Sequence, residues 1–281
     1  IGRGNGKYSV DFTGGMEISY KYEQQIPSAE LRSALEGEFN NARVSYKASM
    51  TDGGLLEVVV PEGSERTNNE SNESMNLDNM VTAAINKNFP DANVEHVGTK
   101  QIGSLVGAKF RQQAIVAMIA AIIGIVLYIS FRFEFGYALG AVAALTHDVL
   151  IGVGVFLLCG RQLSLPVIAA LLTIIGYSLN DTIVVFDRIR ENLDLKKGKF
   201  LDIVNVSLNN ALSRTLLTSV TALIVVLMLL FFGGGAINDF ALIMATGVIV
   251  GTYSSLFVAT PVMIIYHNWA TKRAAAAAAA A

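Results

Sequence analysis

The stretch that decides the fold is Leu165–Phe186, which reads LPVIAALLTIIGYSLNDTIVVF and holds a single charged residue, Asp181. A helix that crosses the ~30 Å hydrocarbon layer of a membrane needs about 20 mostly apolar residues. This stretch is long enough for one crossing, and its uniform apolarity argues against a buried core helix of a soluble protein. We therefore predict a transmembrane helix that carries a carboxyl group inside the membrane.

Four further stretches have the same character, namely Ala114–Phe131, Phe135–Cys159, Leu212–Phe232 and Phe240–Tyr266. The composition agrees with five spans, because 52% of the 281 residues are hydrophobic and only 16% are charged. Soluble domains carry about 25% charged residues. The predicted fold class is an α-helical polytopic membrane bundle. We predict an exterior domain over residues 1–109, a transmembrane domain over 110–270 and a cytoplasmic tail over 271–281.

Basic residues are unevenly distributed over the connectors between the spans. One set of connectors and the tail hold Arg132, Arg188, Arg190, Lys196, Lys197, Lys199, Arg214, Lys272 and Arg273. The opposite set holds only Arg161. Cytoplasmic loops are enriched in Lys and Arg, so we predict a cytoplasmic C-terminus and, with five crossings, an N-terminal domain outside. The terminal run Ala274–Ala281 is interpreted as an artefact and plays no part in the fold prediction.

The region before the first span alternates between two hydrophobic periods. Period-two alternation predicts strands at Met16–Tyr22, Arg43–Met50, Leu55–Pro61 and Ala92–Ile102. Helical spacing predicts helices at Pro27–Phe39 and Leu77–Phe89. Thr51–Gly54 is typical of a hairpin turn, and Glu62–Ser74 is typical of a flexible loop. The order βαββαβ predicts an α+β ferredoxin-like domain with both helices on one face of the sheet.

Chemical motifs are sparse in this N-terminal region. It shows no metal-ligand spacing, nucleophile–base pair or phosphate loop, and the glycine-rich Gly2–Gly6 has no strand before it. The net charge of −2 gives no reason to expect a nucleic-acid partner. The single cysteine, Cys159, excludes an internal disulfide. We therefore expect a binding or docking module, with no cofactor, no metal and no catalytic residue.

Two charged residues lie inside predicted spans near the same membrane face. Asp181 precedes Phe186, the end of the third span, by five residues, and Arg214 stands at the start of the fourth. Ionisable groups in lipid cost at least a few kcal/mol, so they are candidates for function. We expect Asp181 and Arg214 to pair across adjacent helices. The pair could be a switch that opens when Asp181 is protonated or a static ion pair that fixes helix register, and spacing does not decide between them.

Other polar residues accompany these two. His147-Asp148 lies about midway along the second span, either as a third candidate for function or as a satisfied pair packed against Thr146 or a neighbouring helix. We expect Tyr177, Asn180 and Thr215 to support the site. The stretch Asp187-Arg188-Ile189-Arg190-Glu191-Asn192 is predicted to form a structural cytoplasmic corner with local ion pairs. Small residues repeat at four-residue spacing in the last span, at Gly247, Gly251 and Ser255, as in close helix packing.

Several of these stretches together resemble the SecF family. Val10-Asp11-Phe12-Thr13-Gly14-Gly15 is similar to the signature that opens the family's exterior domain, and Leu145–Val149 is similar to its His-Asp motif. The most specific match is Gly176–Asn192, which reads GYSLNDTIVVFDRIREN. Ser213-Arg214-Thr215 followed by Thr218-Ser219 matches the next helix. The resemblance covers residues 10 to 267.

The resemblance implies a protein of the bacterial inner membrane with a fold like the resistance-nodulation-division pumps, formed together with SecD near the SecYEG channel. It implies that proton flow is used to draw preproteins out on the periplasmic side, with membrane lipid, YajC and YidC as further partners. In the family, the Asp and Arg at the positions of Asp181 and Arg214 are linked to proton passage. The resemblance therefore favours the switch.

One feature departs from the family pattern. The resemblance implies six spans, the first before Val10, whereas five are predicted here. We expect either a chain cut before Ile1 or the SecF half of a fused SecD–SecF polypeptide, with a further proton-site carboxylate on the SecD half. Two other functions stay open at this point, a small-molecule exporter of the same superfamily and a non-transporting scaffold of the translocon. Proton and sodium coupling are not distinguished.

Overall fold

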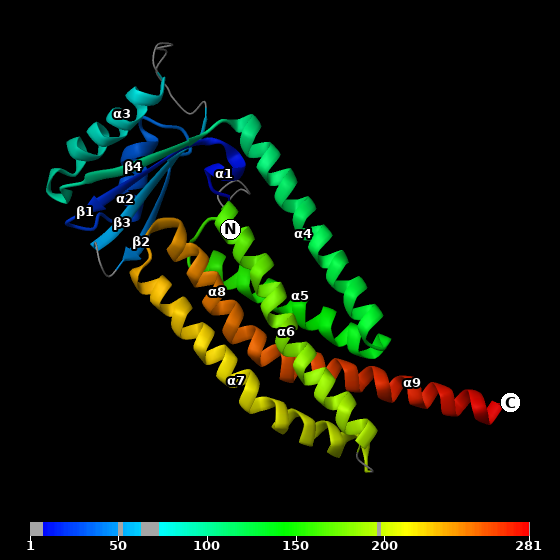
Figure 1. The fold of residues 1–281 in the computed structure, drawn as a ribbon. Helices are drawn as coiled ribbons and strands as arrows, with labels where there is room; N and C mark the ends of the chain where they lie inside the picture. The colour runs from blue at the N-terminus through cyan, green and yellow to red at the C-terminus, as the bar shows by residue number, and fades with distance from the viewer. Residues whose placement is uncertain (1–7, 50–52, 63–72, 196–197, 281) are drawn as a thin grey trace. The chain divides into compact units, whose positions relative to one another are not determined.

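The computed structural model describes residues 8–49, 53–62, 73–195 and 198–280 and is drawn in Figure 1. The chain divides into two compact units. The first unit comprises Ile1–Val116, Phe156–Ile168 and Met228–Ala241, so it combines the N-terminal region with the adjoining ends of several long helices. The second unit comprises Ala117–Val155, Ala169–Leu227 and Leu242–Ala281.

The first unit contains an α+β domain with the predicted order of elements. The elements are α1 (Val10–Thr13), β1 (Gly15–Tyr22), α2 (Ser28–Glu36), β2 (Arg43–Ser49), β3 (Gly53–Val60), α3 (Glu73–Asn88), the 3₁₀ turn η2 (Pro90–Ala92) and β4 (Glu95–Ile102). In the described part of this unit the strands form one antiparallel sheet in the order β2-β3-β1-β4 (Figure 1). The ferredoxin-like prediction is confirmed.

Element ends differ from the prediction at the loops. Gly53 and Gly54, predicted as turn, begin β3, and Glu73 and Ser74, predicted as loop, begin α3. The remaining turn residues Thr51-Asp52 and the predicted loop over residues 63–72 lie outside the described residues. The last predicted strand starts three residues later, at Glu95, because the chain first makes the η2 turn at Pro90.

Alternation along the strands creates the core of this domain. Ile18 and Tyr20 of β1 point to the same face of the sheet and are fully buried. They pack with Leu31 of α2 and Ile85 of α3 in one hydrophobic cluster, so both helices cover one face as predicted. The intervening residues, including Glu17, lie on the opposite face.

Long apolar helices make up the rest of the chain. They are α4 (Ser104–Arg132), α5 (Phe135–Leu158), α6 (Leu165–Leu195), α7 (Phe200–Phe232), α8 (Gly235–Ser254) and α9 (Thr260–Ala280), the last two joined by the π-helical turn η3 (Ser255–Ala259). Among the described residues, five helices are long and apolar enough to cross a membrane when α8, η3 and α9 are counted as one. The five predicted spans are confirmed. The helices α4, α6, α7 and α8–α9 extend beyond the predicted spans, whereas α5 ends one residue earlier, at Leu158.

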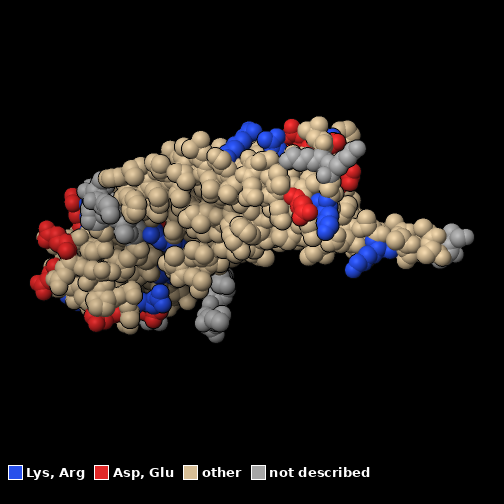
Figure 2. All heavy atoms as spheres, turned by 90° about the horizontal axis from the view of Figure 1, so that it is seen from below, with Lys and Arg blue, Asp and Glu red and all other residues tan. Residues whose placement is uncertain are grey.

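The second unit is held by close packing of small residues against aromatic and branched ones. Ala141 and Ala144 of α5 are buried in one cluster with Phe186 of α6 and Ala259 of η3. A Cβ at Gly140 would meet the carbonyl oxygen of Ala259, so the backbones of α5 and η3 touch here, as small residues allow in membranes. Figure 2 shows a wide region without Lys, Arg, Asp or Glu side chains, as expected for contact with lipid, where charged side chains are costly.

Candidate functional site

Asp181 lies in the interior of the second unit and is bonded to a hydroxyl group. It sits on α6, where its side chain is 2% exposed. Ser219 of α7 donates a hydrogen bond from its hydroxyl to Oδ2 of Asp181 at 3.3 Å. Thr252 of α8 in turn donates to the hydroxyl oxygen of Ser219 at 2.6 Å. A short chain of hydrogen bonds therefore connects the carboxyl group to two neighbouring helices.

Arg214 does not pair with Asp181, so the expectation of an ion pair between them is wrong for the described structure. The arginine is exposed and lines an open pocket of about 370 Å³ together with Asp187, Arg188 and Glu191. The reason is the rotation of α7 about its axis. The buried side of α7 includes Thr215 and Ser219, four residues apart. Arg214 directly precedes Thr215, so its side chain points about 100° away from that buried side.

Asp148 is a second buried carboxyl group, and side chains from two neighbouring helices bond to it. Its residue exposure is 1%. Oδ2 accepts hydrogen bonds from the hydroxyls of Ser178 on α6, at 2.5 Å, and Ser254 on α8, at 2.8 Å. Oδ1 lies 3.0 Å from Nδ1 of His147. Hydrogen-bonded in this way, Asp148 joins α5 to α6 and α8.

The other predicted supporting residues differ in their surroundings. Tyr177 is half-buried, and its hydroxyl has no hydrogen-bond partner in the described structure. Asn180 is exposed and takes no part in the buried hydrogen bonds described above. Thr215 is buried, but its hydroxyl bonds to the backbone carbonyl groups of Ala211 and Leu212 within α7. In the described structure, none of these three side chains makes a hydrogen bond to Asp181.

The predicted corner at residues 187–192 is the helical continuation of α6. Asp187 pairs with Arg132 of α4 at 3.0 Å, and Arg188 pairs with Glu191 at 2.7 Å. Arg190 is exposed. Asn192 is a buried amide that donates to the hydroxyl of Ser207 on α7 at 2.8 Å. These contacts join α6 to α4 and α7.

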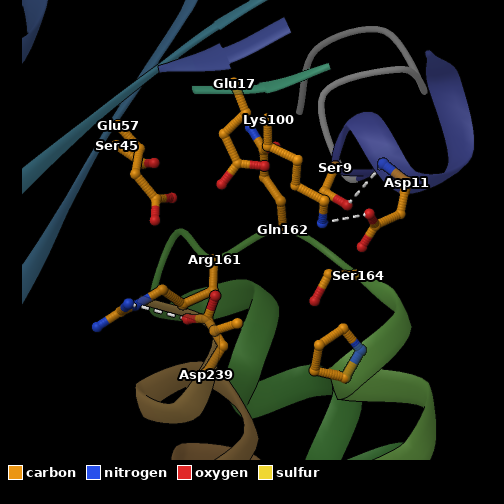
Figure 3. Close-up of a pocket in the computed structure, with 12 residues that line it drawn as sticks. Ser9, Asp11, Glu17, Ser45, Glu57, Lys100, Arg161, Gln162, Ser164 and Asp239 are labelled. Atoms are coloured by element: carbon orange, nitrogen blue, oxygen red, sulfur yellow. Dashed lines mark hydrogen bonds and ion pairs between the residues drawn. The ribbon is translucent and has the colours of Figure 1, made fainter. Parts of the chain in front are cut away.

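The N-terminal signature lies in the first unit, where Asp11 is its best-connected residue. Asp11 is 1% exposed. Oδ2 accepts a hydrogen bond from the backbone N–H of Leu165, the first residue of α6, at 2.9 Å. Oδ1 lies 2.5 Å from Nζ of Lys100 on β4. Figure 3 shows the Lys100 ammonium and the Asp11 carboxylate facing one another.

The rest of the signature explains the shape of this turn. Phe12 is buried against the ring of Tyr8, and Thr13 bonds to the carbonyl oxygen of Ser9 at 3.1 Å. Gly14 and Gly15 have φ of 74° and 118°, in the range that favours glycine. A Cβ at Gly14 would lie 2.5 Å from Cα of Ser104. Glycine at position 14 therefore permits the backbone to lie close to that of Ser104.

A small polar pocket adjoins this turn within the first unit. The lining includes Asp11, Glu17 and Glu57 together with residues of the α5–α6 connector. Arg161 of that connector donates to Asp239 at 2.9 Å (Figure 3). It also donates to the amide oxygen of Asn238 at 3.0 Å. Within the described ranges no group of His, Cys, Asp and Glu has the arrangement of a metal site.

Sequence reasoning assigns no role to the hydroxyl residues that are hydrogen-bonded, directly or through Ser219, to the carboxyl groups. They are Ser178, Ser219, Thr252 and Ser254. The available signal was a hydroxyl residue within an otherwise apolar span, since such residues commonly bond between membrane helices. Together the contacts give two buried carboxyl groups whose hydrogen-bond partners are neutral hydroxyls and one imidazole.

Comparisons with known proteins agree with this architecture. Residues 81–269 match the family model "Protein export membrane protein SecD/SecF, C-terminal". The chain is 41% identical over 264 residues to a protein translocase subunit SecF of Desulfurispirillum indicum, covering 92% of this chain and 82% of that protein. It is 37% identical over 268 residues to a SecF subunit of Thermodesulfovibrio yellowstonii, covering 94% and 85%.

A solved structure shares the fold. The crystal structure of SecDF from Thermus thermophilus, described as a translocon-associated membrane protein, matches with a TM-score of 0.78 and 34% sequence identity. The match covers 94% of this chain and 35% of that one. The chain thus spans about a third of the length of that SecDF protein.

Proposed function

Because the chain belongs to the SecF family of protein translocase subunits, we propose that it acts as an accessory subunit of the Sec protein translocase in the bacterial inner membrane. In this role it works with SecD beside the SecYEG channel and promotes the passage of preproteins, with YajC and YidC as additional neighbours. The distribution of Lys and Arg supports a cytoplasmic C-terminus and a periplasmic domain over residues 1–109.

We further propose that the proton gradient drives this activity through Asp181. The observation that carries the proposal is a buried carboxyl group within an apolar helix whose described hydrogen-bond partner is the neutral hydroxyl of Ser219. An ionised carboxylate in such surroundings is costly without a cation beside it, whereas a protonated one is not. Asp181 is therefore suited to take up a proton on one side of the membrane and release it on the other.

Arg214 is assigned a different part in the same pathway. The guanidinium group lines an open pocket with Asp187, Arg188 and Glu191, where water has access. A positive charge close to a carboxyl group favours its ionised form, so Arg214 favours release of a proton that leaves Asp181 through this pocket. This role requires Arg214 to be close to the route and does not require contact with Asp181.

The test is gradient-dependent export of a preprotein in membrane vesicles that contain the assembled SecD partner. We expect Asp181→Asn to abolish the response to the gradient, because Asn keeps the shape of the side chain but cannot exchange a proton. Arg214→Ala should reduce the response strongly. Thr221→Ala removes an exposed hydroxyl of α7 that bonds only to backbone carbonyls and serves as the matched control, with export unchanged.

The same export assay, together with a deletion strain, separates the competing functions. Normal gradient-dependent export by Asp181→Asn would favour the scaffold over the pump, provided the variant still assembles with SecD. Loss of assembly would instead assign Asp181 a structural role. Unchanged drug susceptibility together with impaired secretion in a deletion strain excludes a small-molecule exporter.

A further inference from the structure

The first turn of α6 is capped by a residue that lies far away in the sequence. The first N–H groups of a helix have no partner within the helix and are normally bonded by a side chain just before it. Ser164 occupies that position, yet its buried hydroxyl has no hydrogen-bond partner in the described structure. Asp11, 154 residues away, accepts the N–H of Leu165 instead.

The charges around this cap are complementary. A carboxylate at the N-terminus of a helix interacts favourably with the partial positive charge of the aligned peptide groups. Asp11 is almost fully buried, and the Lys100 ammonium beside it supplies the cation that a buried carboxylate requires. Lys100 belongs to β4, so the cap is fixed to the sheet as well as to the helix.

Two further contacts join the same segments. Tyr8 and Leu163 form a parallel β-bridge, and the N–H of Ser9 donates to the carbonyl oxygen of Leu163 at 2.8 Å. Arg43 of β2 donates to the carbonyl oxygen of Tyr8 at 2.8 Å. The chain before α1 is therefore bonded to a sheet strand and to the connector that leads into α6.

The signature also touches the start of α4. A Cβ at Gly14 would lie 2.5 Å from Cα of Ser104, the first residue of that helix. A Cβ at Gly107 would lie 3.0 Å from the backbone nitrogen of Gly14. Asp11 of α1 thus contacts the first turn of α6, and Gly14, directly after α1, contacts the first turn of α4.

We propose that Asp11 is a positioning residue that caps α6 from the sheet domain, so that the sheet and the first turn of α6 (Leu165–Ile168) move as one body. The proposal rests on the proposed function in one respect, namely that Asp181 of α6 takes up and releases a proton. A displacement of α6 that accompanies proton uptake is then transmitted directly to the sheet through Asp11, Lys100 and the Leu163 bridge.

Hydrogen exchange at the start of α6, measured by mass spectrometry on the full chain assembled with SecD, tests the cap. We expect Asp11→Ala to raise exchange of the Leu165, Val167 and Ile168 amides about fivefold, the effect of losing one helix cap; Pro166 has no amide hydrogen. The core strand β1 should not change. Asp11→Asn keeps an oxygen that can accept the Leu165 N–H and should stay close to the parent. Ser164→Ala is the matched control and should change nothing.

Unchanged exchange at residues 165–168 in Asp11→Ala would overturn the proposal. A uniform increase over the sheet and α6 would overturn it as well, because Asp11 would then stabilise the fold without positioning the helix. These readings do not depend on export, so they stand even if Asp181→Asn shows that the proton proposal fails.

A disulfide tests whether the segment before α1 and the connector before α6 move together. Tyr8→Cys and Leu163→Cys place cysteines at the bridged pair, in a Cys159→Ser background that removes the natural thiol. We expect the disulfide to form in membranes and the oxidised protein to keep the gradient-dependent export of the reduced one. Loss of export on oxidation, restored by a reductant, would show that the contact must open and would refute movement as one body.

Discussion

Ser219 donates a hydrogen bond from α7 to Oδ2 of Asp181 on α6, at 3.3 Å. The hydroxyl of Ser219 receives a hydrogen bond from Thr252 of α8 at 2.6 Å, so the serine is oriented before it meets the carboxyl group. This arrangement makes the surroundings of Asp181 polar without making them charged. Its effect on stability and on proton exchange can be measured separately.

Ser219→Ala should destabilise the protein and shift the pH dependence of gradient-driven export. The substitution leaves a buried carboxyl oxygen without its donor, which costs about 1–3 kcal/mol. Thermal unfolding in detergent and export at a series of pH values are the measurements. Thr221→Ala removes an exposed hydroxyl on the same helix that bonds only to backbone carbonyls, and equal effects of the two variants would contradict the prediction.

Asp148→Leu should destabilise the protein more than Asp148→Asn. Leucine removes the acceptor that Ser178 and Ser254 share, and a buried polar group left without a partner costs about 1–3 kcal/mol. Asparagine retains one oxygen for those hydroxyls. Chemical denaturation in detergent gives the free energies of unfolding, and a leucine variant as stable as the asparagine one would show that the three helices do not depend on this carboxyl group.

Gly247→Ala should destabilise the contact between α8 and α6. A Cβ at Gly247 would overlap the side chain of Ile174, and overpacking of this kind costs about 1–3 kcal/mol. Gly154→Ala on α5 is the control, because a Cβ there meets nothing within 4 Å. Thermal unfolding of the two variants should differ clearly, and similar stabilities would mean that the helices separate at little cost.

The α+β domain should lose stability between pH 10 and pH 12. Burial raises the pKa of Tyr20 from 10.0 to about 12, and burial likewise raises the pKa of Tyr46 from 10.0 to about 12. Both groups favour the folded state while neutral, so their contribution is complete below pH 10 and is lost as the pH rises through 12. When tyrosinate absorbance is followed against pH, two tyrosines should ionise only near pH 12. Tyr20→Phe should remove one of these two ionisation steps.

The sequence was sufficient for the elements and their order. Long apolar stretches locate the membrane helices because the thickness of the lipid layer sets their length. Alternation at Ile18 and Tyr20 locates the core face of the sheet because successive side chains point to opposite faces. Both patterns are local, so one chain without relatives is enough to recognise them.

The pairing of side chains could not be predicted in the same way. Counting residues from the membrane edge places Asp181 and Arg214 at similar depth, but depth leaves the rotation of each helix about its axis undetermined. Arg214 is turned out of the buried stripe that holds Thr215 and Ser219. Ser254, 106 residues after Asp148, becomes its partner only through the packing of α8 on α5, which no local pattern contains.

The π-helical turn Ser255–Ala259 determines the rotation of α9 about its helix axis. The hydroxyl of Thr260 bonds to the carbonyl oxygen of Ser255, five positions back, at 3.2 Å. Deleting one residue here would restore a regular helix but rotate α9 by about 100° about its own axis. Met263, now 2% exposed, would leave the core, while the buried side of α8 would stay where it is. The number of residues in this turn therefore determines which side of α9 is buried in the core.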